Sequence, residues 1–512
     1  MALSPSARNM AALVGVCLAA LMFGLEISSV PVILPTLETA LPADFRGLQW
    51  IMNAYTIACT TVLMATGTLA DRFGRKRVFT ITTIAFGATS LMCGLADNVS
   101  LLIAARFLQG LAGGAMLTCV IAIISHQFQD ERERGRAFTA WGVISGIGLG
   151  FGPIIGGLIA SWSSWHWVFL IHVPLTVLAL IPALIGIRES RDPHAQKLDI
   201  AGIVTLTLAV FGLAFLITQG MELDRVLAIV LAVLTVAAFA GFVVAERVNP
   251  HPMFDFSVFR IRRFSGAIIG CIGMNWCYWP FMIYLPIYFQ GGLGLDSRAV
   301  GFLLLAYTIP FLVMPPVADR LLQRGGPRLV IPLGMAAMGT GFLLMWFGSG
   351  VAQAGWLTVL PGTLLAGIGL GLTNTPVTNT TTGSVPANRA GMASGIDISA
   401  RLITLAINIA MMGLILVEGI RWSLPAAVSS ALDVSQMQAL AASVAAGNLA
   451  ALPQAYPALA ALDPSGTAVH GALVEGFGWV MLYGGIGAWV LAVVSFAIFG
   501  PGRSRQAQTA EA

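Results

Sequence analysis

Charged side chains are scarce in this 512-residue sequence. Asp, Glu, Lys and Arg make up only 10% of it, whereas about 25% is usual for a soluble domain. Hydrophobic residues make up 57%. A soluble protein of this length cannot cover its surface with so few charges, and apolar stretches of the ~20 residues needed to cross a bilayer recur from end to end. The composition therefore excludes a soluble globular protein and predicts an all-α polytopic membrane protein.

Lysine is rarer still, with Lys76 and Lys197 as its two occurrences. Neither lies in a G-x-x-x-x-G-K-[ST] loop, which excludes ATP-driven pumping by this chain alone. The six cysteines lie inside apolar runs without metal-ligand spacing, so we interpret them as small core residues: Cys17, Cys59, Cys93, Cys119, Cys271 and Cys277. A nucleophile elbow is also absent. We expect no metal, no cofactor, no nucleic-acid partner and no enzymatic activity, which leaves an ion gradient as the energy source.

The apolar runs predict fourteen membrane spans. They cover 11–34, 50–70, 78–96, 99–124, 137–160, 166–187, 200–219, 225–246, 265–289, 298–318, 329–348, 355–378, 391–415 and 474–498. The first run resembles a signal peptide, but it extends for about 23 residues and carries Glu26, so we expect an uncleaved first helix.

The basic residues fix the predicted orientation. With the N-terminus in the cytoplasm, the inside loops and tails hold 21 of the 27 lysines and arginines and the outside loops hold 4. By the positive-inside rule, both termini are cytoplasmic in a multi-pass protein of the cytoplasmic (inner) membrane. The stretch "GTLADRFGRKR" (67–77) then forms a cytoplasmic turn.

Two short repeats predict an internal duplication. "LADR" at 69–72 recurs as "VADR" at 317–320, and "ISGIG" at 144–148 recurs as "ASGID" at 393–397, at nearly the same offset. We expect two six-helix bundles, 1–187 and 264–512, separated by an inserted helical hairpin with its flanking loops, 188–263. The second bundle contains a long external loop at about 416–473. Chance repetition in an apolar sequence is the alternative.

Several motifs resemble one family. "GTLADRFGRKR" resembles the signature between spans 2 and 3 of the major facilitator superfamily, and "RFLQGLAGGA" (106–115) resembles its span 4 motif. "GIGLGFGPIIGG" (146–157) is similar to the span 5 antiporter motif of drug exporters. "WHWVFLIHVP" (165–174) and "LPIYFQGGLG" (285–294) fit the fourteen-span drug:proton antiporter branch. The resemblance implies the major facilitator fold, while the substrate follows from it only by analogy.

The resemblance gives the cytoplasmic turn a second function. The family pattern implies that Asp71 faces the positive N-terminus of the span that begins near Gly391, after Arg389, and so latches the two halves in one facing state. The candidate latch residues are Gly67, Asp71, Arg72, Gly74, Arg75 and Arg389. In the alternative interpretation the arginines only anchor the topology.

The glycines of 146–157 do not stabilise a helix, since each costs up to ~1 kcal/mol relative to alanine. Small residues at this spacing form a groove for close helix contact, and a proline bends the helix. By family likeness this helix seals and slides between the halves. The candidates are Gly148, Gly152, Pro153, Gly156 and Gly157. Ordinary small-residue packing is compatible with that role.

Charges inside spans are functional candidates, because an ionisable group at mid-bilayer costs at least ~2.5–3.5 kcal/mol. Glu26 and Arg106 lie at similar depths in spans 11–34 and 99–124, and the resemblance makes these spans neighbours at the central cavity. We predict that deprotonated Glu26 pairs with Arg106 and that protonation releases it. Family members usually carry Asp at this position. A structural ion pair without a transport role is the alternative.

A second charged pair lies in the span 391–415. Asp397 and Arg401 are four residues apart and therefore share a helix face, where they can pair directly. The pair is either a second proton site or an anchor for that span.

The span 265–289 is rich in aromatic residues, which suit a flat or cationic ligand. Our substrate-contact candidates are Asn53, Asn275, Trp276, Trp279, Tyr284 and Asn374. An interfacial aromatic belt and interhelical hydrogen bonding are the alternatives. We interpret His172 as a packing residue.

Together these features predict a proton-coupled antiporter that exports amphipathic or cationic organic compounds by alternating access, as in multidrug efflux and antibiotic resistance. The expected partners are the lipid bilayer, a small-molecule substrate and protons. An exporter of one natural metabolite, a proton-coupled uptake symporter, and a membrane sensor or enzyme without transport are the alternatives.

Overall fold

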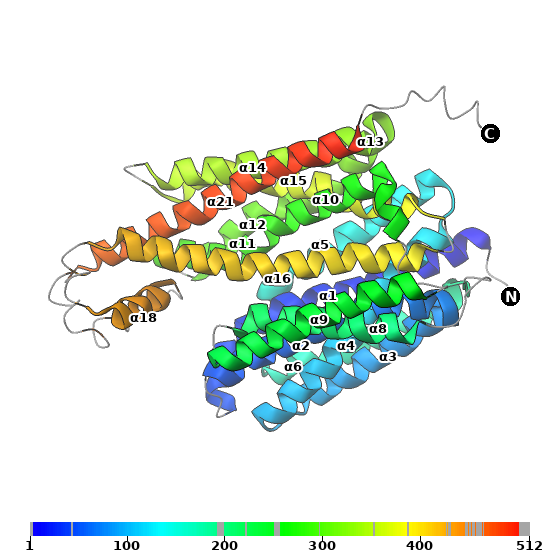
Figure 1. Cartoon of the computed structure of the whole chain (residues 1–512), viewed down its shortest axis with the longest axis horizontal. Coiled ribbons are helices and arrows are strands. Elements are labelled where there is room, and N and C mark those ends of the chain that lie inside the picture. The colour runs from blue at the N-terminus through cyan, green and yellow to red at the C-terminus, as the bar shows by residue number, and fades with distance from the viewer. Residues whose placement is uncertain are drawn as a thin grey trace. The chain divides into compact units, whose positions relative to one another are not determined.

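The computed structural model of the protein has no β-strand in the residues that it describes. These residues are 4–41, 45–191, 199–220, 223–249, 256–295, 297–351, 354–386, 389–425, 432–445 and 465–500, with the single residues 428, 449, 452, 456 and 463. The predicted all-α membrane fold is confirmed by this helical architecture (Figure 1).

The described residues of the first half of the chain and of the hairpin that follows it form nine α-helices. They are α1 (Pro5–Ala40), α2 (Phe45–Phe73), α3 (Arg75–Gly94), α4 (Val99–Gln127), α5 (Glu131–Trp162), α6 (His166–Leu170), α7 (His172–Gly186), α8 (Ile200–Gln219) and α9 (Arg225–Val248). Acidic and amide side chains determine where several of them begin. The Asn98 side chain accepts the backbone N–H of Leu101 at the start of α4, and Asp130 accepts those of Arg132 and Glu133 at the start of α5.

The rest of the chain contains more interrupted elements. They are η2 (Phe256–Arg260), α10 (Arg262–Trp276), α11 (Tyr278–Ile287), the π-helical η3 (Tyr288–Gly292), α12 (Ser297–Val313), α13 (Pro315–Gly325), α14 (Pro327–Ser349), α15 (Trp356–Gly383), α16 (Ala390–Ser423), α18 (Val434–Ala445) and α21 (Thr467–Phe499). Helices α16 and α21 extend into the loop predicted at 416–473, and α18 lies within it. Much of that loop lies outside the described residues.

Ten helices of the described chain are long and apolar enough to cross a membrane, and twelve if each of two bent pairs is one span. One bent pair is α5 itself, which turns by 51° between Glu131–Gly152 and Ile154–Trp162. Proline at the break removes a helical hydrogen bond, which explains the bend. Two shorter apolar helices, Trp50–Leu63 and Ile200–Leu213, coincide with predicted spans. The count of fourteen spans stays a prediction.

The chain divides into two compact units. Unit 1 comprises 1–268, 315–327 and 375–403, and unit 2 comprises 269–314, 328–374 and 404–512. Unit 1 therefore contains the whole first half of the sequence, the hairpin, and two segments from the second half. The predicted division into 1–187, 188–263 and 264–512 remains a proposal about the duplicated origin of the chain.

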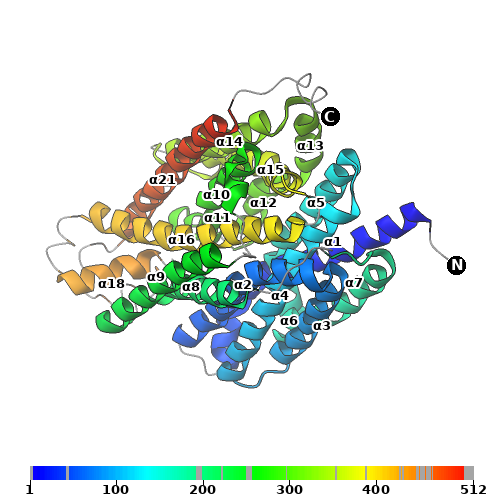
Figure 2. The same ribbon diagram turned by 45° about the vertical axis from the view of Figure 1, so that its right-hand side comes forward.

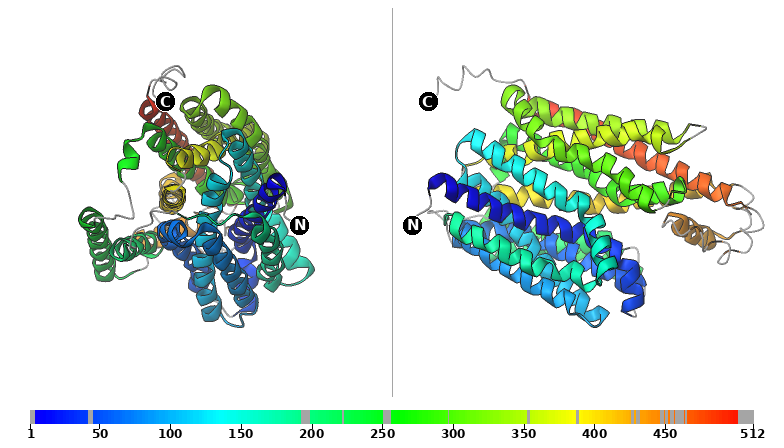
Figure 3. Two further views of the ribbon diagram at one scale, coloured as in Figure 1. Left: turned by 90° about the vertical axis from the view of Figure 1, so that its right-hand side faces the viewer. Right: turned by 180° about the vertical axis from the view of Figure 1, so that it is seen from behind.

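Within unit 1, α1 packs against α5 and α7, while α4 packs against α2 and α3. The hairpin helices α8 and α9 lie side by side, with α8 against α2 (Figures 1 and 2). Figure 3 shows α1, in dark blue, running beside α5 and α7. This arrangement surrounds the inner face of α1 with α4, α5 and α7, and the buried Glu26 and Arg106 lie there.

Candidate functional site

A fully buried ion pair links α1 to α4. Nη1 of Arg106 donates to Oε1 of Glu26, and both side chains have at most 1% of their surface exposed. The same nitrogen donates to Oε1 of Gln109 at 2.8 Å, and Nε of Arg106 donates to the carbonyl oxygen of Ile51 at 3.1 Å. The predicted pairing of Glu26 with Arg106 is confirmed by this geometry, whereas its role in transport is a separate question.

Aromatic and polar groups complete the surroundings of Arg106. Its guanidinium lies 4.3 Å from the centre of the Tyr55 ring, close enough for a cation–π interaction. Gln109 is itself held by Ser90 on α3, because Nε2 of Gln109 donates to Oγ of Ser90 at 2.8 Å. Sequence reasoning missed Gln109, Tyr55 and Ser90, since neutral polar residues in an apolar helix carry no signal of their own.

His172 on α7 also belongs to this site. Its Nδ1 lies 3.4 Å from Oε2 of Glu26, and the imidazole is fully buried. The ring does pack edge-on against Phe86, at 5.7 Å between centroids. Its contact with the carboxylate corrects the interpretation of His172 as a packing residue only. Glu26 therefore lies between two basic side chains, one at each carboxylate oxygen.

The arrangement can respond to a proton at Glu26. While the carboxylate is charged, it neutralises Arg106 in the buried interior of unit 1. Protonation would leave a buried guanidinium without its counter-charge, and removing one partner of a buried pair destabilises by about 3–5 kcal/mol. A change of charge on this one group can thus favour a rearrangement of α1 relative to α4.

The second charged pair lies at the start of α16. Nε of Arg401 donates to Oδ2 of Asp397 at 3.0 Å, as their spacing predicts. Thr378 on α15 joins them: its hydroxyl donates to Asp397 at 3.3 Å and accepts from Nη2 of Arg401 at 2.6 Å. The pair therefore ties α16 to α15 within unit 1, and Asp397 is fully buried.

Asp71 at the end of α2 connects to the first turn of α16. Its Oδ2 accepts the backbone N–H of Met392 at 3.2 Å, and its Oδ1 accepts Nη2 of Arg75 at 2.6 Å. A carboxylate is stabilised at a helix N-terminus by the unpaired N–H groups there. Gly74, between α2 and α3, has φ +108°, a conformation that favours glycine. The contact expected from the sequence is present.

The other latch candidates occupy different environments. Gly67 is buried in α2, Arg72 is half-buried, and Arg389 is exposed just before α16. Arg75 is fully buried, and its backbone N–H donates to the carbonyl oxygen of Ser190 at 2.9 Å. Arg75 is therefore a structural link between α2, α3 and the segment after α7, in addition to any effect on topology.

The glycines of α5 face α1. A Cβ added to Gly148 would lie 2.7 Å from the carbonyl oxygen of Leu21, and one added to Gly156 would lie 2.7 Å from Cβ of Ser29. Gly152 likewise contacts Ser28, while Gly157 is only half-buried. The close packing that the sequence predicts is present, and its partner is α1 of the same unit. Pro153 lies at the bend of α5.

Most of the substrate-contact candidates make ring contacts or hydrogen bonds within the protein. Trp276 stacks on Tyr483 at 5.1 Å, and Tyr284 donates to the carbonyl oxygen of Ile409 at 2.7 Å. Trp279 packs edge-on against Phe311 at 5.8 Å. The side chain of Asn275 donates to the carbonyl oxygen of Cys271 in its own helix, which is not the interhelical hydrogen bond of the alternative. Asn374 is buried and Asn53 is half-buried.

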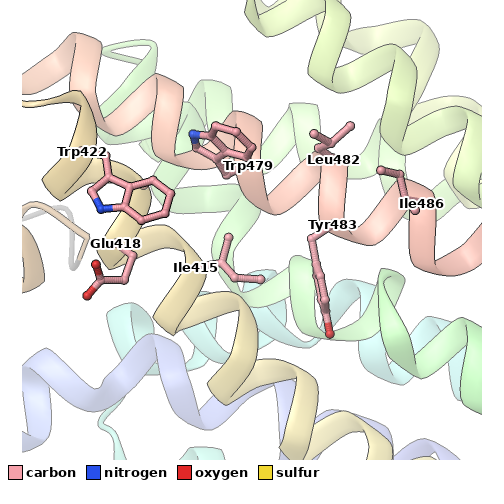
Figure 4. A pocket seen from close by; sticks show the side chains of 8 residues that line it. Ile415, Glu418, Trp422, Trp479, Leu482, Tyr483 and Ile486 are labelled. Carbon is pink, nitrogen blue, oxygen red and sulfur yellow. The ribbon is translucent and has the colours of Figure 1, made fainter.

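Unit 2 carries a shallow apolar hollow of about 330 Å³ between α16 and α21. Its lining includes Ile415, Glu418, Trp422, Trp479, Tyr483 and Ile486. Figure 4 shows the Glu418 carboxylate directed away from Trp479, and it pairs with Arg421 at 3.1 Å. Indole and aliphatic groups therefore dominate this hollow. In the part of the chain that the structure describes, no group of three or more His, Cys, Asp or Glu side chains could hold a metal ion.

A helical, multi-pass membrane protein with buried charged pairs between its spans has the features of a membrane transporter. The chain belongs to the Major Facilitator Superfamily, whose family model matches residues 16–407. Members of this family are membrane transporters, and such a protein contacts the lipid bilayer and a small-molecule substrate.

Two curated relatives and one solved structure illustrate the similarity. The chain is 30% identical over 397 residues to the multidrug resistance protein Stp of Mycobacterium tuberculosis (strain CDC 1551 / Oshkosh), covering 77% of this chain and 73% of Stp. It is 30% identical over 418 residues to the puromycin resistance protein pur8 of Streptomyces alboniger, covering 80% and 82%. The human organic anion transporter MFSD10 superimposes with a TM-score of 0.63 at 12% identity over 97% of this chain and 100% of that one, which shows the fold alone.

Proposed function

We propose that this protein is a proton-coupled antiporter that exports amphipathic or cationic organic compounds by alternating access. The observation that carries the proposal is the buried Glu26–Arg106 pair, a titratable carboxylate next to a permanent cation in the membrane interior. The names of its relatives, a multidrug resistance protein and a puromycin resistance protein, support export of toxic organic compounds.

The magnitudes are compatible with this coupling. Breaking a buried ion pair by neutralising one partner is worth about 3–5 kcal/mol. One proton moving down a membrane potential of ~100 mV supplies about 2.3 kcal/mol, and each pH unit of gradient adds about 1.4 kcal/mol. The gradient and the pair are therefore of similar energy, so that protonation of Glu26 can switch the transporter and loss of the proton can reset it.

In this mechanism the other sites support the switch. Asp397 and Arg401 act as a second proton site or as the anchor of α16. Asp71 latches the first turn of α16 in one state. The other residues of the latch are Gly67, Arg72, Gly74, Arg75 and Arg389. The bent α5 moves along α1 through Gly148, Gly152, Pro153, Gly156 and Gly157. Asn53, Asn275, Trp276, Trp279, Tyr284 and Asn374 remain the candidates for substrate contact.

The protein acts in the cytoplasmic membrane with both termini in the cytoplasm, as a transporter and not as an enzyme. The excess of lysine and arginine in the predicted inside loops supports this orientation.

Transport by the purified full-length protein in proteoliposomes tests the proposal. An imposed pH gradient is expected to drive movement of the organic cation tetraphenylphosphonium, and nigericin, which collapses that gradient, is expected to stop it. Transport that continues unchanged with nigericin would contradict proton coupling.

Export of a single natural metabolite is the second candidate, because the name of one relative specifies a single compound. A transport screen of dyes, quaternary amines and antibiotics distinguishes the two. Several unrelated substrates indicate multidrug export, and one substrate indicates a dedicated exporter.

A further inference from the structure

Both ring nitrogens of His172 face oxygen atoms. Nε2 lies 3.1 Å from the carbonyl oxygen of Met22 on α1. Nδ1 lies 3.2 Å from the carbonyl oxygen of Phe169 and 3.4 Å from Oε2 of Glu26. A carbonyl oxygen can only accept a hydrogen bond, so each nitrogen needs a hydrogen to make a favourable contact.

A neutral imidazole carries only one N–H. If that hydrogen is on Nε2, the lone pair of Nδ1 points at the oxygens of Phe169 and Glu26. If it is on Nδ1, the lone pair of Nε2 points at the oxygen of Met22. Only the doubly protonated imidazolium satisfies both sides of the ring, and a buried polar group facing a like lone pair is destabilising.

The Glu26 carboxylate, which also pairs with Arg106, is the anionic group that faces the His172 ring. Its Oε1 accepts from Arg106, whereas Oε2 accepts no hydrogen bond from the described residues. His172 is the group that approaches Oε2. One carboxylate oxygen of Glu26 therefore faces Arg106, a permanent cation, and the other faces His172, a titratable group.

We propose that His172 is a second proton-coupling residue, which holds a proton as an imidazolium against Oε2 of Glu26. The inference deepens the proposed function and rests on it for its role in transport. In the coupling step, the N–H bond at Nδ1 breaks as an O–H bond forms at Oε2. The electron pair of the N–H bond stays on the ring, and a neutral imidazole and a neutral carboxylic acid result.

The other groups around the His172 ring do not take its proton. From α3, the ring of Phe86 packs edge-on against His172. From α4, Arg106 contacts Glu26 and repels a proton from the far side of the same carboxylate. On α6, His166 is stacked on Trp165 and bonded to Ser164.

A direct test is the charge of His172 in the full-length protein near neutral pH. Nitrogen-15 NMR of the histidine rings is expected to show an imidazolium signal, with both nitrogens protonated, that disappears from the spectrum of His172→Gln. The same signal is expected to become that of a neutral ring in Glu26→Gln, where the counter-charge is lost. A neutral His172 ring in the wild type would overturn the proposal.

Proton release on substrate binding tests the role. If the proton that His172 passes to Glu26 leaves the protein when tetraphenylphosphonium binds, the Kd for tetraphenylphosphonium falls about tenfold for each unit by which the pH rises, in the range where release occurs. In His172→Gln and His172→Asn this slope is expected to be lost over the same range. The matched control His166→Gln is expected to keep the wild-type slope.

The outcomes distinguish a failure of the His172 inference from a failure of the proposed function. An unchanged slope in both His172 variants, with folding confirmed, would overturn the coupling role, because a purely structural histidine can alter Kd without altering its pH dependence. If the wild type itself shows no slope, proton coupling fails as a whole, and the NMR spectrum alone then decides whether His172 is an imidazolium.

Discussion

Arg106 is fixed by three kinds of contact at once. It pairs with the Glu26 carboxylate, donates to Gln109 and to the carbonyl oxygen of Ile51, and lies over the Tyr55 ring. A planar guanidinium with donors in several directions suits this site, and a lysine ammonium on a flexible stem does not reproduce it. The residue thus positions the carboxylate as well as neutralising it.

Arg106→Lys keeps the charge and removes the planar fork. We expect at least a tenfold loss of proton-driven transport in proteoliposomes, equivalent to about 1.4 kcal/mol, because the ammonium cannot hold Glu26 and Gln109 in one geometry. Arg421→Lys is the matched control, since its pair with Glu418 is partly exposed and such pairs contribute about 0–1 kcal/mol. Wild-type rates in both variants would contradict the assigned geometry.

The sequence predicted the charged residues of the site better than its neutral ones. Glu26, Arg106, Asp397 and Arg401 are visible because charges are rare inside apolar spans. His172 was interpreted as a packing residue because its approach to Glu26 joins segments far apart in the chain, and nothing in "IHVP" indicates where the ring points. Thr378, which bridges Asp397 and Arg401, was missed for the same reason.

At the scale of elements, the contact between α1 and α5 depends on small residues. Three glycines spaced four residues apart on α5 allow the two backbones to approach closely, and the hydroxyl of Ser28 donates to the carbonyl oxygens of Gly24 and Gly148 at 2.7 and 3.0 Å. Because Glu26 lies on α1 within this contact, the packing of α5 helps to determine where the carboxylate sits.

Gly156→Ala introduces a methyl group that meets Cβ of Ser29 at 2.7 Å. Overpacking of this kind destabilises by about 1–3 kcal/mol, which exceeds the gain of up to ~1 kcal/mol in helix propensity. We expect a lower Tm of the purified protein. Gly471→Ala on α21 meets no atom within 4 Å and is expected to keep or raise the Tm. Equal shifts in the same direction would show that the glycine contact is unimportant.

Helix positions followed from the apolar runs, but their interruptions did not. The predicted span 265–289 is divided into α10, α11 and the π-helical η3, with a break at Cys277 between the first two. Bends depend on tertiary packing and on single residues, whereas hydropathy averages over a window. The 51° bend of α5 was the exception, because a proline within the glycine run signals it.

At the scale of the whole molecule, the two "ADR" sequences occupy corresponding places. Asp71 at the end of α2 contacts the first turn of α16, and Asp319 in α13 lies against Gly135 in the first turns of α5. Each carboxylate therefore meets the beginning of a helix that belongs to the other half of the sequence. This correspondence supports the duplication inferred from the two short repeats.

Asp71→Asn removes the charge at the start of α16 and weakens its interaction with the N–H of Met392. Carboxylates at helix N-termini contribute about 0.3–2 kcal/mol, so we expect hydrogen exchange of the first α16 amides to accelerate by about 2- to 30-fold. Asp97→Asn, an exposed position bonded to Asn98, is the control and should leave that exchange unchanged. Unaltered protection in Asp71→Asn would argue against the latch.

The central claim is that a proton on Glu26 drives transport, and Glu26→Gln tests it most directly, since glutamine keeps the shape of the side chain but cannot ionise. In proteoliposomes, we expect this variant to lose tetraphenylphosphonium transport driven by a pH gradient while it still exchanges labelled for unlabelled substrate at equal concentrations. Gradient-driven transport at the wild-type rate in Glu26→Gln would contradict the account.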